Sequence, residues 1–62
     1  MKPRELVKLL NENGYIFARQ SGSHAIFKNP LSKIIVVPMH NRDIPKGTLT
    51  GILKDAEIEI KQ

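Results

Sequence analysis

The sequence predicts an α+β fold, a two-layer sandwich in which two helices cover one face of a three-stranded antiparallel sheet. Three observations predict it: apolar residues recur at helical spacing towards each end of the 62-residue chain, short β-branched and aromatic stretches lie between them, and turn-forming residues separate those stretches. Amphipathic helices need an apolar surface to cover, and one face of a small sheet supplies it. The other face of the sheet is then expected to stay open to solvent.

The first element is a helix within residues 2–15. Pro3 suits the first turn of a helix, because a proline there loses no intrahelical hydrogen bond. Leu6 and Leu10 belong to an apolar stripe on one side. Gly14 can adopt the left-handed conformation that ends a helix.

Three strands are predicted at residues 15–20, 24–28 and 33–38, where β-branched and aromatic residues favour an extended chain. Ser21-Gly22-Ser23 and Asn29-Pro30 are turn sequences between them. Short turns join antiparallel neighbours, so the order helix, strand, strand, strand is a meander preceded by a helix.

A second helix is predicted from Pro45, which with Gly47 would occupy its first turn. Its core-facing stripe has the spacing i, i+3, i+4 and i+7 and consists of Leu49, Ile52, Leu53 and Ala56.

Composition limits the function classes. Ten lysines and arginines against six acidic residues give a net charge of +4, which attracts polyanions, although solubility alone would also explain it. The chain has no cysteine, and two histidines sixteen residues apart do not have the spacing of a metal site, so neither a metal nor another cofactor is expected. No stretch resembles a signal peptide or a membrane span. We therefore expect one cytoplasmic domain over residues 1–62.

His24 is the first residue of the second predicted strand. Phe27 is the largest apolar residue of that strand and should face the helices, which would place His24 and Lys28 on the open face. An imidazole changes protonation near neutral pH and can act as a general acid or base there. The alternative is an exposed histidine at the start of a strand with no special role.

The motifs together resemble the HicA toxins of HicA–HicB toxin–antitoxin modules over almost the whole chain. They are Gly14-Tyr15, Arg19-Gln20, Gly22-Ser23-His24, Val36-Val37-Pro38 with His40, and Lys46-Gly47-Thr48-Leu49. The resemblance implies a fold like that of double-stranded-RNA-binding domains and a metal-independent mRNA interferase activity. It also implies that His24 is the catalytic residue and that a HicB-like antitoxin neutralises the protein.

RNA carries its own nucleophile, the 2′-hydroxyl, so the protein need only move protons and stabilise charge on the phosphate. The hypothesis is that His24 moves one proton and that His40 is a possible second proton carrier; His40 can equally be a loop histidine that bonds the backbone. The residues expected to contact RNA are Arg19, Ser23, Lys28, Lys33 and Lys46. Lys46 would precede backbone N–H groups at a helix start, which favour a phosphate. Lys2, Arg4 and Lys8 can add to a basic rim, although charged outer helix faces are usually only solvated.

The end of the chain departs from the family pattern, because Glu57 stands where a helix-stopping glycine is expected. Ile58 and Ile60 alternate with Glu59, and three roles stay open for them: a short strand, packing on the helices, or contact with a partner. Two other functions stay open: an RNA-binding module without turnover, and an interaction protein whose open face receives an antitoxin.

Overall fold

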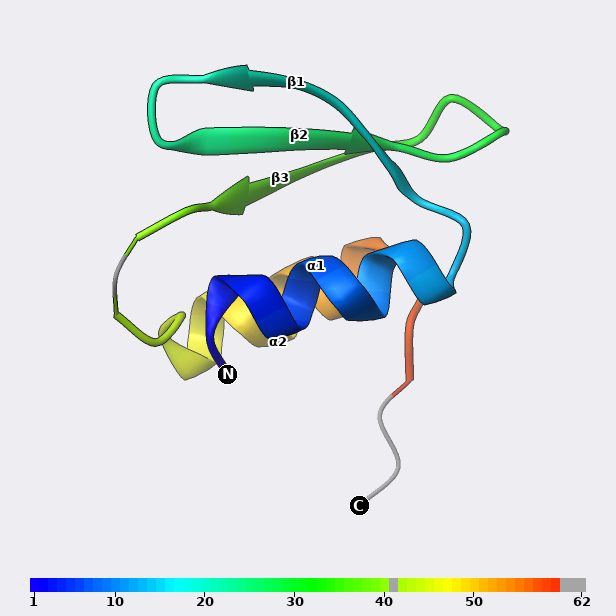
Figure 1. Ribbon diagram of the computed structural model, residues 1–62. Helices are drawn as coiled ribbons and strands as arrows, with labels where there is room; N and C mark the ends of the chain where they lie inside the picture. The colour runs from blue at the N-terminus through cyan, green and yellow to red at the C-terminus, as the bar shows by residue number, and fades with distance from the viewer. Residues whose placement is uncertain (41, 60–62) are drawn as a thin grey trace.

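The computed structural model describes residues 1–40 and 42–59, and both helices lie on the same side of the sheet (Figure 1). In chain order the elements are α1 (Pro3–Glu12), β1 (Ile16–Ser21), β2 (His24–Lys28), β3 (Ile34–Pro38) and α2 (Lys46–Asp55). The predicted fold class and element order are confirmed, and no predicted element is missing. No helix among the described residues is long and apolar enough to cross a membrane.

The sheet is antiparallel with the order β1-β2-β3. Ala25 and Phe27 of β2 pair with Val37 and Ile35 of β3, and all four side chains are buried beneath the helices. The alternate residues of the two strands point the other way, and His24 and Lys28 among them are exposed. The alternation in β2 therefore has the phase that its sequence predicts.

Strand β1 contains an irregularity between Phe17 and Arg19, where the pairing with β2 shifts by one residue. Phe17 pairs with the buried Phe27, and the two rings meet edge to face with centroids 5.9 Å apart. Beyond the shift Arg19 pairs with Ile26, whose side chain points to the open face. The irregularity thus brings Arg19 to the open face, whereas simple alternation would keep it on the same side as Phe17.

The core lies between the sheet and the helices, and its buried hydrophobic residues are Leu6, Leu10, Tyr15, Ala25, Phe27, Ile35, Val37, Ile44, Ala56 and Ile58. Both helices pack against β3, whereas every residue of β1 is exposed. In the predicted stripe, Leu49, Ile52 and Leu53 belong to α2 and are half-buried. Only Ala56, the residue directly after the helix, is fully buried. Ile44, in the loop before α2, was not predicted as a core residue.

Both helices end in the same backbone motif. After α1, the N–H of Tyr15 donates to Leu10 O and that of Gly14 to Asn11 O; after α2, the N–H of Ile58 donates to Leu53 O and that of Glu57 to Lys54 O. This is the Schellman pattern, with a left-handed residue directly after the helix cap. That residue is Gly14 (φ 87°) in one case and Glu57 (φ 59°) in the other.

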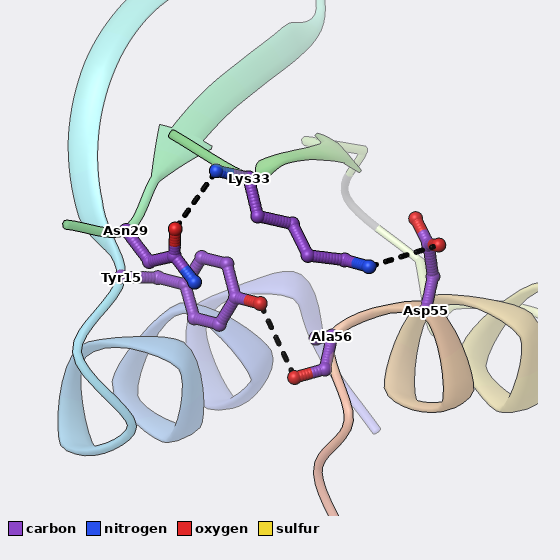
Figure 2. A network of polar contacts seen from close by, with 5 residues as sticks. All are labelled: Tyr15, Asn29, Lys33, Asp55 and Ala56. Carbon is purple, nitrogen blue, oxygen red and sulfur yellow. Dashed lines mark hydrogen bonds and ion pairs between the residues drawn. The ribbon is translucent and has the colours of Figure 1, made fainter. Parts of the chain in front are cut away.

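The two helix ends are joined by a hydrogen bond from the Tyr15 hydroxyl to the Ala56 carbonyl oxygen, at 3.2 Å (Figure 2). Ile58, two residues after Ala56, is buried in the core, so of the roles considered for it the structure supports packing. Ile60 lies outside the described residues.

Candidate active site

His24 is held on the open face by the turn between β1 and β2. Gly22 adopts a left-handed backbone conformation (φ 59°), and the Gln20 side-chain amide donates to the Gly22 carbonyl oxygen at 3.0 Å. On the other side of β2, the Met39 N–H donates to Ser23 O at 2.7 Å. The backbone before His24 is thus tied to both neighbouring strands, while the imidazole stays exposed to solvent.

His24 and His40 line the same cleft, of about 400 Å³. His24 comes from β2 and His40 from the loop after β3, so residues from different elements meet here. The remaining walls are largely apolar and consist of Val36, Pro38, Pro45, Thr48 and Ile52. The cleft lies where the end of β3 faces the start of α2.

In the described part of the chain, no side-chain hydrogen bond and no ion pair involves the imidazole of His24 or of His40. Both rings are exposed, so their nitrogen atoms are available to a bound molecule. Two imidazoles in one cleft can divide proton transfer, one accepting a proton and the other donating one.

The start of α2 forms one wall of this cleft through Pro45 and Thr48. The first hydrogen bond of the helix runs from the Leu49 N–H to Pro45 O at 2.8 Å. The N–H groups of the residues before Leu49 therefore have no acceptor within the helix, and no side chain caps them. Together with the helix dipole, these groups favour an anion at this wall.

The predicted RNA-contacting residues are distributed unevenly around the cleft. Ser23 is adjacent to His24, Arg19 lies on the open face, and Lys46 is the exposed first residue of α2. Lys28 is exposed at the far end of β2, four residues from His24, which corresponds to roughly 13 Å along a strand.

Lys33 lies elsewhere. Its ammonium group pairs with the Asp55 carboxylate at 3.8 Å, and its backbone N–H donates to Asn29 Oδ1 at 2.8 Å (Figure 2). Lys33 and Asp55 line a second cleft, of about 800 Å³, between β3 and α2, which contains neither histidine.

Some residues of the site were not found by sequence reasoning. Pro38, Pro45 and Ile52 form walls of the histidine cleft, and only tertiary packing brings them together.

Within residues 1–40 and 42–59, no group of three potential metal ligands lies close enough to hold a metal ion.

A comparison with curated proteins gives no significant match. The family model described as HicA toxin of bacterial toxin–antitoxin matches residues 3–58. That match runs from the first residue of α1 to the buried Ile58, so it includes the whole sheet, both helices and the histidine cleft. The chain therefore belongs to the HicA toxin family of bacterial toxin–antitoxin systems.

Proposed function

We propose that this toxin is an endoribonuclease that cleaves mRNA without a metal ion, with His24 as its catalytic residue. The observation that carries the proposal is the position of His24 and His40 on the walls of one solvent-open cleft. Membership of a toxin family agrees with an activity that stops translation.

The reaction requires two proton transfers. The 2′-hydroxyl loses a proton as its oxygen bonds to phosphorus, the bond from phosphorus to the 5′-oxygen breaks, and the 5′-oxygen gains a proton. A neutral imidazole accepts the first proton and a protonated imidazole donates the second. His24 and His40, which line the same cleft, can fill these two roles, and the products are a 2′,3′-cyclic phosphate and a 5′-hydroxyl.

Phosphate binding is the second requirement. Arg19 and Lys28 bring positive charge to the open face, and Ser23 offers a hydroxyl beside His24. Lys46, the first residue of α2, and the first-turn N–H groups of that helix can hold the scissile phosphate where Pro45 and Thr48 line the cleft. Negative charge that grows on the phosphate during the reaction would be stabilised by these donors.

The test is cleavage of RNA by the purified protein and by His24→Ala. His24 is exposed and makes no side-chain hydrogen bond with the described residues, so the variant should fold as the wild type does while cleavage falls about 10²- to 10⁴-fold. His40→Ala should lose activity as well. Lys54→Ala is a matched control, because Lys54 is exposed on α2 and lines neither of the clefts that contain His40.

Mapping the RNA ends tests the chemistry separately. Cyclic phosphate ends support attack by the 2′-oxygen, and 3′-hydroxyl ends contradict it. If the wild-type protein binds RNA but leaves it intact at every pH between 5 and 8, the protein is an RNA-binding module without turnover, a function that the cations of the open face also favour.

A HicB-like antitoxin is the second partner that we propose. Ile16 and Ile34 flank Lys28 on the open face and are 67% and 55% exposed, and exposed apolar side chains on a sheet face are typical of a protein interface. An antitoxin that covers this face would block the histidine cleft or the approach to it. The substitution of both isoleucines by threonine, which also favours strands, should weaken inhibition by the antitoxin and leave RNA cleavage intact.

A further inference from the structure

A third cleft, of about 660 Å³, lies at the start of α1, and His40 is one of its lining residues. His40 also lines the cleft that contains His24, so the two clefts share this residue. The cleft at α1 is rich in charge: Lys2, Arg4 and Lys8 line it together with a single acidic residue, Glu5.

The charges of this cleft are only partly compensated within the protein. The Lys2 ammonium group pairs with the Asp43 carboxylate at 3.3 Å, and the Glu5 carboxylate accepts the Lys2 backbone N–H at 2.8 Å. Arg4 and Lys8 are exposed, and neither forms an ion pair with any residue that the structure describes. Two positive charges in the cleft therefore face solvent with no ion-pair partner among residues 1–40 and 42–59.

Arg4 and Lys8 are four residues apart in α1, so they lie on the same side of the helix, one turn from each other. Like charges at this spacing repel and destabilise a helix. An anion between the two side chains would remove that repulsion. A phosphate fits this chemistry, because the guanidinium group of arginine binds two phosphate oxygens at once and lysine adds a point charge.

We propose that the cleft at the start of α1 binds a backbone phosphate of the RNA substrate next to the cleaved linkage, with Arg4 and Lys8 as its ligands. The inference rests on the proposed function, since it extends the RNA strand from His24 past His40 to α1. The protein should then prefer substrates that continue by a few nucleotides on one side of the cleavage site.

The experiment compares a minimal RNA, with one nucleotide on each side of the linkage, with RNAs extended by three nucleotides on the 5′ side or on the 3′ side. For the wild type, one of the two extensions should raise kcat/KM about tenfold, mainly through KM. In the Arg4→Gln/Lys8→Gln variant, the ratio of kcat/KM for extended and minimal RNA should fall towards one. Glutamine has a helix propensity similar to that of arginine and lysine, so α1 should persist.

Lys54→Gln is the matched control, because it removes one exposed positive charge from α2 and lines neither of the clefts that contain His40. The ratio should stay unchanged in this variant. The inference is overturned if neither extension helps the wild type, or if the Arg4→Gln/Lys8→Gln variant keeps the full ratio.

The same series measured as dissociation constants with the His24→Ala protein separates this inference from the proposed function. A length-dependent gain in affinity that needs Arg4 and Lys8 supports the phosphate site even if the wild type cleaves no RNA. Equal affinity for minimal and extended RNA in this background overturns it.

Discussion

The two faces of β2 differ in almost every physical respect, although they belong to one strand of five residues. Ala25 and Phe27 are each 2% exposed and pack beneath the helices, whereas His24 and Lys28 point to solvent. Apart from the Tyr15 hydroxyl, which is hydrogen-bonded, the buried side chains of the described residues carry no polar or charged group. Stability therefore comes from one face, and the chemistry that we propose belongs to the other.

This separation has a practical consequence. Substitutions on the covered face should change the free energy of unfolding. They should change activity only because they change the fraction of folded protein. Substitutions on the open face should change RNA binding and cleavage with little effect on folding.

Phe27→Ala should give the largest loss of stability. Phe27 fills the centre of the covered face and contacts Phe17 edge to face, and removal of a buried phenylalanine costs about 3–5 kcal/mol. A 62-residue domain has a total stability of only about 5 kcal/mol, so much of the protein should be unfolded at 37 °C. Chemical denaturation followed by circular dichroism measures the effect. A loss below about 1 kcal/mol would contradict the central position of Phe27 in the core.

Arg19→Gln/Lys28→Gln should leave the fold intact and weaken RNA binding. Both side chains are exposed on the open face, and loss of charged contacts to phosphate should raise the dissociation constant on the order of tenfold. The dependence of affinity on salt should become shallower, because fewer counterions are released. Binding measured by fluorescence anisotropy at several salt concentrations reads both quantities.

Lys33→Gln tests whether a lysine away from the histidine cleft contributes to RNA binding. Lys33 pairs with Asp55 in the cleft without histidines, so we expect a smaller change in RNA affinity than Lys28→Gln causes. An equal loss of RNA affinity in Lys33→Gln and Lys28→Gln would mean that RNA contacts continue around the edge of β3. The contact between Lys33 and RNA that the sequence predicts would then be supported.

The two faces were not equally predictable from the sequence. The alternation in β2 has an obvious phase because Phe27 can be placed only on the covered side, and from this the exposure of His24 follows. The position of Arg19 could not be predicted, because the shift in pairing after Phe17 depends on how β1 meets β2. The burial of Ile44 and the shared wall at His40 depend on the path of the loop after β3, which local patterns do not determine.

Tyr15→Phe tests the contact between the two helix ends. The tyrosine ring is 2% exposed and its hydroxyl donates to the Ala56 carbonyl oxygen, so the variant keeps the packing and loses one buried hydrogen bond. The free energy of unfolding should fall by about 1 kcal/mol, while RNA cleavage at a permissive temperature stays unchanged. Reduced cleavage with unchanged stability would show that the covered and open faces are coupled.

Glu57→Gly should have the smallest effect and the opposite sign. Glu57 occupies after α2 the left-handed position that Gly14 occupies after α1, and a side chain with a β-carbon is strained there. Its negative charge also lies at the helix C-terminus, where the dipole disfavours it. Glycine relieves the backbone strain and removes the charge, but it also makes the unfolded chain more flexible. The net gain in the free energy of unfolding should therefore be about 0.5 kcal/mol.

A gain of that size should raise the melting temperature by about 2–4 °C in a domain of this length. Glu57→Gln separates the two causes, because it removes the charge and keeps the strained backbone, so it should stabilise less than glycine does. If glutamine stabilises as much as glycine, the backbone strain is negligible and only the charge matters. In either case RNA cleavage should stay at the wild-type level, since the backbone of Glu57 ends the helix on the covered side and its side chain lines the cleft without histidines.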